Sequence, residues 1–214
     1  MVNKFKHIFE NKPIKEAIEY QFYKLASQKL GEKASATIVT GPDVLRHIAN
    51  FYSLFNTKKL RICEIADDTY KQIKEDIKGI PGITLNRNIA DYGSRLLDLD
   101  VCNLKQLEQT KPAILKQISN YSTNCRDAKG FIITFGLRTS GTKICYKKAL
   151  NSYLGLVGGS IKKITKKHIT CTDRFNYVKE LKLHFHYKGR IKYVKCYLYS
   201  TGGGPMITCL TIYK

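Results

Sequence analysis

Two aspartates, Asp98 and Asp100, follow a short apolar run in the segment 94–103, SRLLDLDVCN. The segment is typical of a buried strand that continues into a polar turn, so its acids are expected where a strand meets its loop. Two earlier apolar runs lead to acids in the same way, with Glu64 after the first and Asp91 after the second. In open α/β sheets, ligands bind outside the carboxyl ends of the strands. The pattern therefore predicts a nucleoside- or nucleotide-like ligand held by carboxylates.

The charge of the chain points to a polyanionic partner. Its 214 residues include 37 Lys and Arg against 17 Asp and Glu, which gives a net charge of +20. The positive electrostatic field of such a charge favours nucleic acid, RNA or DNA, as the partner. A lysine-rich surface that serves solubility is the plainer alternative. An anionic membrane is a third, but no strongly amphipathic basic helix supports it.

The sharpest basic cluster is the tract 161–168, IKKITKKH, near the expected crossover after the fifth strand. Lysines in such a tract suit phosphate contacts, which position a nucleic acid without reading its sequence. A solvated charged surface explains the same tract without a ligand. The residues expected to contact phosphates are Lys162, Lys163, Lys166 and Lys167 in the tract, with Arg138 and Lys143 before it.

Cysteine usage and hydropathy indicate a cytoplasmic protein. The chain has 7 cysteines with no CxxC pair, so neither a disulfide framework nor a zinc knuckle is indicated, and reduced thiols are expected. His184 and His186 share one face of an expected strand, but no further ligand stands at a recognisable spacing, so no metal is expected. No apolar run approaches ~20 residues, so no membrane helix is expected. The sequence does not indicate the oligomeric state.

Hydrophobic periodicity predicts alternating strands and helices. A first helix is expected over 14–30, where apolar residues recur at close to helical spacing. Later helices are expected over 43–55, 69–77, 104–121 and 143–156. Strands are expected over 36–40, 59–65, 82–89, 94–100 and 130–138. A hairpin over 181–200 and a last strand over 206–213 end the chain, so an alternating α/β unit is followed by antiparallel strands.

With this order of elements and acids, the chain resembles class I S-adenosylmethionine-dependent methyltransferases over about residues 36–214. The resemblance implies an α/β fold with a Rossmann-like, mostly parallel seven-stranded sheet, helices on both faces and a C-terminal antiparallel hairpin. Residues 1–35 would form an N-terminal helical segment packed on the core. Residues 36–214 would form the methyltransferase-like domain.

The resemblance also assigns residues to S-adenosylmethionine as the cofactor. Gly41, in VTGPD, matches the glycine-rich first loop, and Glu64, 23 residues later, matches the acid that binds the ribose hydroxyls. Asp91 corresponds to the acid that meets the adenine amino group, and the neighbouring Tyr92 would stack on the base. The fourth-strand motif falls on DLDVCN without its usual proline and aromatic residue. The catalytic candidates there are Asp100, nearer the strand end, and Asp98.

Plainer interpretations of these residues remain open. Glu64 also suits a surface position at a strand end, and Asp91 suits an Asx-turn. The expected function is methyl transfer to RNA or DNA beside Asp100. A catalytically inactive, methyltransferase-like nucleic-acid-binding protein is the main alternative, because the first loop has a single glycine. A nicotinamide-dependent oxidoreductase is a third, against which the absence of GxGxxG and the terminal hairpin count.

Overall fold

The computed structural model describes residues 13–39, 41, 43–57, 59–87, 94–101, 129–139, 142–143, 150–151, 159–171, 176–187, 191–201 and 204–213. The helices in this part of the chain are α1 (Pro13–Leu30), α2 (Val44–Leu54) and α3 (Asp67–Asp76). The parallel part of the sheet is formed by β1 (Ala36–Val39), β2 (Leu60–Cys63), β3 (Ile83–Asn86), β4 (Leu96–Val101) and β5 (Gly130–Gly136). The later strands are β6 (Arg138–Thr139), β7 (Thr142–Lys143), β8 (Gly159–Cys171), β9 (Asn176–Tyr187), β10 (Ile191–Thr201) and β11 (Pro205–Tyr213).

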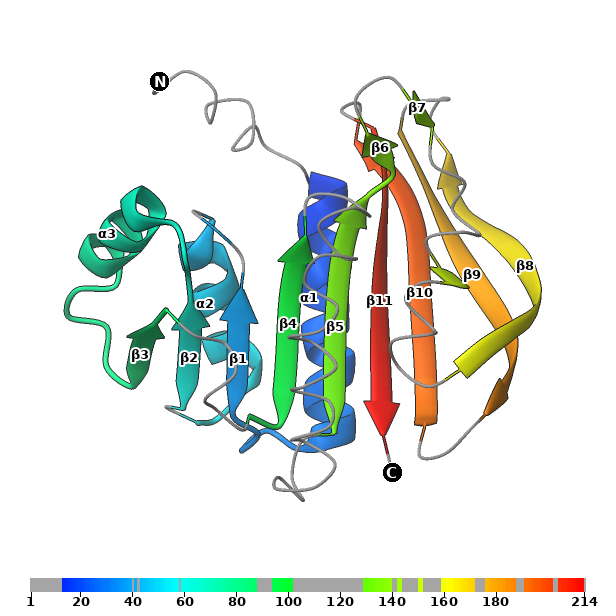
Figure 1. Cartoon of the computed structure of the whole chain (residues 1–214). Helices are drawn as coiled ribbons and strands as arrows, with labels where there is room; N and C mark the ends of the chain where they lie inside the picture. The colour runs from blue at the N-terminus through cyan, green and yellow to red at the C-terminus, as the bar shows by residue number, and fades with distance from the viewer. Residues whose placement is uncertain are drawn as a thin grey trace.

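The main sheet has nine strands in the order β3-β2-β1-β4-β5-β11-β10-β9-β8 (Figure 1). The first five are parallel, and β11 lies antiparallel between β5 and β10. From β11 outward every pair is antiparallel. This is a Rossmann-like α/β fold with antiparallel C-terminal strands. The sheet has two strands more than the seven predicted.

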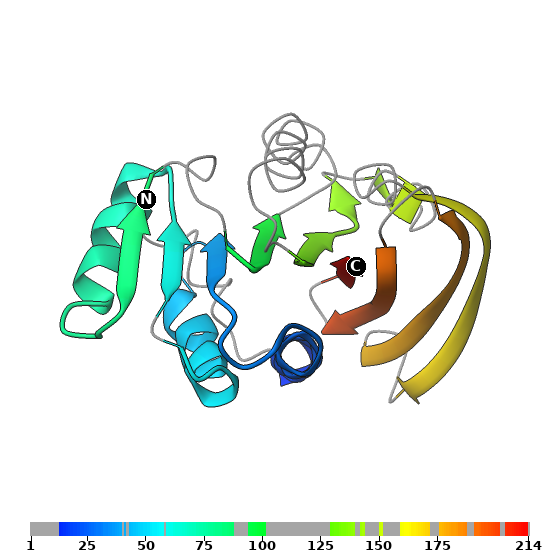
Figure 2. The ribbon, with the colours of Figure 1, turned by 90° about the horizontal axis from the view of Figure 1, so that it is seen from below.

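The helices and the sheet bury two separate clusters, one on each face of the sheet. The first joins Phe22 of α1, Phe51 of α2 and Ile73 of α3 to alternate residues of the strands. Figure 2 shows α1 and α2 on the same side of the sheet. The second cluster, on the opposite face, includes Leu150 in a short helical piece. The helix predicted over 104–121 and most of that over 143–156 lie outside the described residues.

The sequence of α1 explains why it packs against the centre of the sheet. Ile18, Phe22 and Ala26 recur every four residues and are buried, so they form one apolar stripe. Burying a side chain such as Phe22 contributes about 1.5–3 kcal/mol. At the end of the helix, Leu30 approaches β5 closely because Gly130 has no side chain there; a Cβ on Gly130 would lie 2.6 Å from Leu30. The domain boundary drawn at residue 35 stays a prediction. None of the helices that the structure describes is both long and apolar enough to cross a membrane.

Nearly all of the strands and helices predicted over the described residues are present within a few residues of the expected bounds, but β8 was not predicted. The tract 161–168 was expected at a crossover and instead lies inside this strand of 13 residues. The register of β8 against β9 shifts between Ile161 and Lys163 and again between His168 and Thr170. Each extra residue reverses the alternation of faces, so the tract lacks the period of two by which a half-buried strand is recognised. Lys143, expected in a helix, lies in β7.

Candidate cofactor and acceptor site

Gly41, between β1 and α2, has open space beside its backbone. Gly41 has a φ of 64°, in the left-handed region that side chains rarely adopt. A Cβ placed on Gly41 would meet no atom within 4 Å, so a ligand can approach the backbone closely there. Asp43, at the start of α2, makes no side-chain capping hydrogen bond and instead pairs with Arg46. The loop therefore combines an open glycine with a first helical turn fixed by an ion pair.

Glu64 lies at the end of the neighbouring strand. Its backbone N–H donates to the carbonyl of Asn86 at 3.0 Å, which fixes it beside the end of β3. Its Oε1 accepts a hydrogen bond from the N–H of Ala66 at 2.8 Å. A carboxylate has about four acceptor positions, so it can accept further hydrogen bonds. The half-buried Glu64 carboxylate suits a ligand with vicinal hydroxyls.

A large apolar side chain lies next to Glu64. Ile65 is 82% exposed, the highest value among the large exposed hydrophobic residues in the described part of the chain. Arg87, directly after β3, holds this loop: its Nη1 lies 2.6 Å from Asp67 and 3.4 Å from the carbonyl oxygen of Ile65. Its Cζ also lies 4.2 Å from the centre of the Tyr70 ring. Ile65 could not be singled out from the sequence, since an isolated apolar residue after a strand carries no pattern.

Of the two catalytic candidates of the fourth strand, the structure describes the side chain of Asp98 and the backbone position of Asp100. Asp98 is 3% exposed, and its Oδ2 accepts a hydrogen bond from the hydroxyl of Tyr23 at 2.6 Å. Nδ1 of His47 lies 3.3 Å from the same oxygen. Because Tyr23 gives its only proton to the carboxylate, the contact with His47 needs a proton on Nδ1. Asp100, two residues on, is paired in register with Thr134 of β5.

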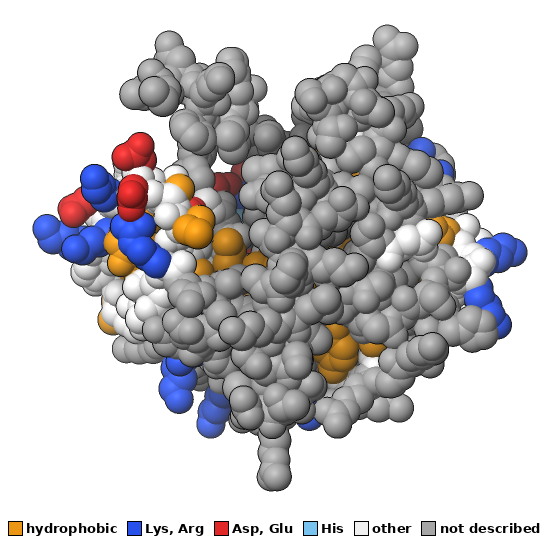
Figure 3. All heavy atoms as spheres, in the orientation of Figure 1, with side chains coloured by type: hydrophobic (Ala, Val, Ile, Leu, Met, Phe, Trp, Pro, Cys, Tyr) orange, Lys and Arg blue, Asp and Glu red, His pale blue; other side chains and the backbone are white. Residues whose placement is uncertain are grey.

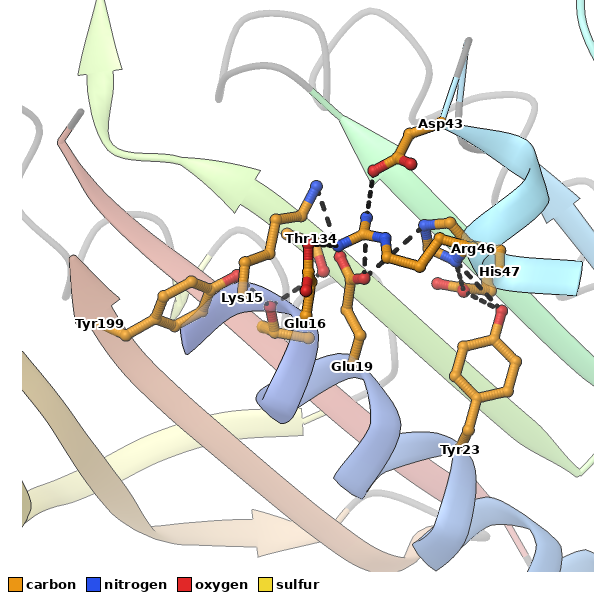
Figure 4. Close-up of polar contacts among 11 residues, drawn as sticks. Lys15, Glu16, Glu19, Tyr23, Asp43, Arg46, His47, Thr134 and Tyr199 are labelled. Atoms are coloured by element: carbon orange, nitrogen blue, oxygen red, sulfur yellow. Dashed lines mark hydrogen bonds and ion pairs between the residues drawn. The ribbon is translucent and has the colours of Figure 1, made fainter. Parts of the chain in front are cut away.

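A second buried carboxylate, Glu19 of α1, extends this cluster toward the first loop (Figure 4). Glu19 is 3% exposed and lies 3.0 Å from Nη2 of Arg46 and 3.3 Å from Nζ of Lys15. Nε2 of His47 lies 3.8 Å from Glu19, between the two carboxylates. Since Arg46 also pairs with Asp43, contacts run without a break from the Gly41 loop to Asp98.

The part of α1 in this cluster was not predicted from the sequence. Lys15, Glu19 and Tyr23 are spaced by four, so they lie on one face of the helix. That spacing was visible in the sequence, but the partners stand far along the chain: Asp98 follows Tyr23 by 75 residues. Three further buried residues are joined by hydrogen bonds: the hydroxyls of Thr134 and Tyr199 each bond to the hydroxyl of Thr208.

The remaining predicted residues are divided between separate places. Asp91 and Tyr92 lie outside the described residues. Arg138 and Lys143 pair in the small β6–β7 sheet, whereas the four lysines of the tract lie in β8, at the outer edge of the main sheet. Figure 3 shows Lys and Arg side chains at that edge. Among the residues that the structure describes, no three His, Cys, Asp or Glu side chains are placed to hold a metal ion.

Comparison with known proteins supports the fold. No protein-family model matches the chain, and no curated protein sequence matches it. The methyltransferase domain of METTL16 superposes with a TM-score of 0.55 at 10% identity, over 96% of this chain and 70% of that chain. PH1948 from Pyrococcus horikoshii, assigned as an RNA methyltransferase, superposes with a TM-score of 0.50 at 8% identity, over 97% of this chain and 87% of its own. The chain thus has the fold of class I S-adenosylmethionine-dependent methyltransferases.

Proposed function

We propose that this protein binds S-adenosylmethionine at the carboxyl ends of β1 and β2 and methylates RNA or DNA. The proposal rests on the positions of two residues: Gly41 and Glu64 follow two adjacent parallel strands, β1 and β2. Ile38 of β1 pairs directly with Ile62 of β2, so the residues that follow both strands emerge at the same edge of the sheet. An approachable backbone beside an acid suits a nucleoside that carries a charged amino-acid group.

The residues around this edge fit the cofactor. Glu64 would accept hydrogen bonds from the two ribose hydroxyls, and the exposed Ile65 offers an apolar contact for the flat face of the adenine. By the resemblance alone, Asp91 and Tyr92, which lie outside the described residues, would meet the amino group and the second face of the adenine. Gly41 would admit the methionine part along the backbone, where a side chain would take up the space.

In the acceptor site, Asp100 would bind the group of the substrate that receives the methyl group. When bound, S-adenosylmethionine supplies a methyl group whose bond to sulfur breaks as the acceptor lone pair forms the new bond, which leaves S-adenosylhomocysteine. Asp100 would accept a hydrogen bond from the acceptor N–H or O–H, orient its lone pair and take up its proton. Asp98, held by Tyr23 and His47 inside the fold, would fix the strand that carries Asp100.

Nucleic acid as the substrate is supported by charge. The net charge of +20 raises the local concentration of polyanions, and exposed lysines gather on β8. PH1948, which shares the fold, is assigned as an RNA methyltransferase. This likeness at 8% identity makes RNA a reasonable first substrate to assay and assigns no base.

An inactive nucleic-acid-binding protein with this fold is the second candidate. The observation in its favour is the setting of Asp98, which is buried and engaged by Tyr23 and His47. If the fourth strand serves structure alone, the fold would bind nucleic acid without transferring a methyl group.

Titration calorimetry with S-adenosylhomocysteine tests the cofactor site. We expect wild type to bind and both Glu64→Ala and Glu64→Gln to lose binding, because each removes the carboxylate that accepts two hydroxyl hydrogen bonds. Glu75→Ala, at an exposed acid of α3, is the control and should bind like wild type. Equal affinity of wild type and both Glu64 variants would remove Glu64 from the site. Transfer of labelled methyl to RNA or DNA then separates the enzyme from the inactive candidate.

A further inference from the structure

Three long antiparallel strands extend the sheet beyond β11. They are β10, β9 and β8, with 11, 12 and 13 residues, and β8 forms the outer edge. In Figure 2, β8 and β9 curve toward the side of the sheet on which α1 lies. This extension therefore presents a curved face beside α1.

The register shows which side chains share that face. Val178 packs in the core cluster on the α1 side, so by alternation Glu180, Lys182 and His184 of β9 also point to that side. Residues paired directly across antiparallel strands share a face. The pairs with β8 are Lys163 with His184, Thr165 with Lys182, and Lys167 with Glu180.

Two of the four lysines in the basic tract thus lie on the α1 side, and Lys166 lies on the other. Ile164 packs in the cluster on the opposite face, and Lys166 is two residues beyond it. Burial raises the pKa of the Tyr177 hydroxyl, while the charge of Lys166 lowers it, so Lys166 lies near this tyrosine. Tyr177 packs in the same opposite cluster. Lys162 occupies the first register shift.

We name Lys163, Lys167, Lys182 and Lys195 the lysine face. The first three are exposed, and Lys195 of β10 lies 3.4 Å from Glu180, the only acid among the described residues of these three strands. Burial alone would lower the pKa of Lys195, but its hydrogen bond with Tyr197 and the nearby Glu180 raise it above the ordinary value. Lys195 is therefore charged at neutral pH.

Positive charge continues from this face onto α1. Nζ of Lys29, near the end of the helix, lies 5.3 Å from the centre of the Tyr193 ring. Tyr193 packs on the α1 side of β10, two residues before Lys195. The lysine face and Lys29 thus border the same curved region, next to aromatic rings that suit stacking against bases.

The lysine face is connected in register to the proposed acceptor site. One row of paired residues crosses six strands from β4 to β8: Asp100, Thr134, Thr208, Tyr197, Glu180 and Lys167. Since neighbouring strands lie about 4.8 Å apart, the row spans about 24 Å. The middle of this row is buried, with Thr134 and Thr208 at most 2% exposed. A strand whose acceptor base lies at Asp100 would therefore pass over α1 and reach the lysine face with phosphates several nucleotides away.

We infer that the lysine face binds the sugar–phosphate backbone of the nucleic acid several nucleotides from the methylated position. The inference rests on the proposed function. Backbone contacts of this kind fix where a strand lies without reading its sequence. The face thus acts as a positioning surface for the substrate, and the opposite face of the same strands does not.

Binding of 20-nucleotide single-stranded RNA and DNA, followed by fluorescence anisotropy from 50 to 200 mM salt, tests the inference. The variant is Lys167→Gln and Lys182→Gln together, one lysine from each of β8 and β9. The matched control is Lys166→Gln and Lys179→Gln, which removes two charges from the opposite face of the same two strands. Single-strand binding loses about 0.7 of salt slope per phosphate contact, so the slope of the variant should be shallower by about 1.4. The control should keep the wild-type slope, and both should bind S-adenosylhomocysteine like wild type.

Each other outcome has a definite meaning. Equal losses in variant and control would overturn the inference and leave nucleic acid as the substrate, because net charge alone would then explain binding. No loss in either would also overturn it and assign the lysines to protection of an exposed edge strand. Failure of wild type to bind RNA or DNA would remove the proposed substrate as well. Selective loss of binding to phosphatidylserine vesicles, with nucleic-acid binding intact, would replace nucleic acid by a membrane on this face.

Discussion

The hydroxyl of Tyr23 lies 2.6 Å from Oδ2 of Asp98, so one hydrogen bond joins the first helix to the fourth strand of the sheet. Both side chains are buried, and His47 lies 3.3 Å from each of the two oxygen atoms. The three residues come from α1, α2 and β4. Their contacts fix the helices against the strand that carries the proposed acceptor site.

Removing this hydroxyl should destabilise the protein. Tyr23→Phe leaves the buried Asp98 without its shortest hydrogen bond, and losing a hydrogen bond to a charged group costs about 1.5–3 kcal/mol. Urea unfolding followed by circular dichroism should show a lower free energy of unfolding. Tyr20→Phe, at a tyrosine that is 39% exposed on the same helix, is the control and should stay within about 0.5 kcal/mol of wild type. Equal stability of all three proteins would show that Asp98 does not depend on Tyr23.

Changing each of the two acids of β4 to asparagine should have a different effect. Asp100→Asn should leave stability and S-adenosylhomocysteine binding intact while methyl transfer falls about 100- to 10,000-fold, the usual loss for a positioned acid–base group. Asp98→Asn should lower the free energy of unfolding, because it breaks a buried polar cluster. Transfer of labelled methyl and urea unfolding, measured on both variants, give the comparison. Normal transfer by Asp100→Asn would place the acceptor site elsewhere.

Gly41 and Gly79 allow the cofactor loop to be tested with a matched control. Both have a positive φ, 64° and 83°, and a Cβ on either would meet no atom within 4 Å. Gly41→Ala and Gly79→Ala should therefore lose similar stability, about 1–2 kcal/mol, from the left-handed backbone. Calorimetry should find weaker S-adenosylhomocysteine binding for Gly41→Ala alone, since Gly79 lies in the turn after α3. Wild-type affinity of Gly41→Ala would exclude a close approach of the cofactor to this loop.

Stability should decline at high pH. Burial, together with a hydrogen bond to Cys196, raises the pKa of the Cys209 thiol well above its ordinary value of 9.0, and burial raises that of the Tyr213 hydroxyl. Both groups ionise more readily in the unfolded chain, so stability should be constant below about pH 9 and fall above it, by up to about 1.4 kcal/mol per pH unit for each group. Urea unfolding from pH 7 to 10.5 measures this. Tyr213→Phe should make the decline above pH 10 shallower, and a flat profile in wild type would contradict the assignment.

The sequence predicted the parallel half of the fold well, because each strand there is a short apolar run between clear turns. LRIC and GFIITFG are examples, and both form strands close to the expected bounds. The outer strand β8 escaped detection because its register shifts, at Lys162 and Ile169, interrupt the alternation of faces. A tract with four lysines in six residues was therefore assigned to a crossover.

The candidate site was predicted only where local order determines it. Gly41 and Glu64 follow strands, so their place at the carboxyl edge could be inferred from the chain alone. The cluster of Glu19, Arg46 and Asp98 depends on how α1 packs across the sheet, which no local pattern encodes. The roles assigned to these residues in cofactor binding and catalysis stay predictions.

The position of β8 and β9 at the free edge of the sheet has a consequence for how this protein can change. Among the strands that the structure describes, β8 and β9 pair with the rest of the sheet through β10 alone, so they can lengthen, shorten or gain charge without altering the pairing of β1, β2 and β4. If the lysine face positions the substrate, as we infer, substrate preference can diverge while the half of the molecule that surrounds Gly41 and Glu64 stays the same. The outer strands would then form a replaceable module, and grafting them onto another protein of this fold would alter substrate choice.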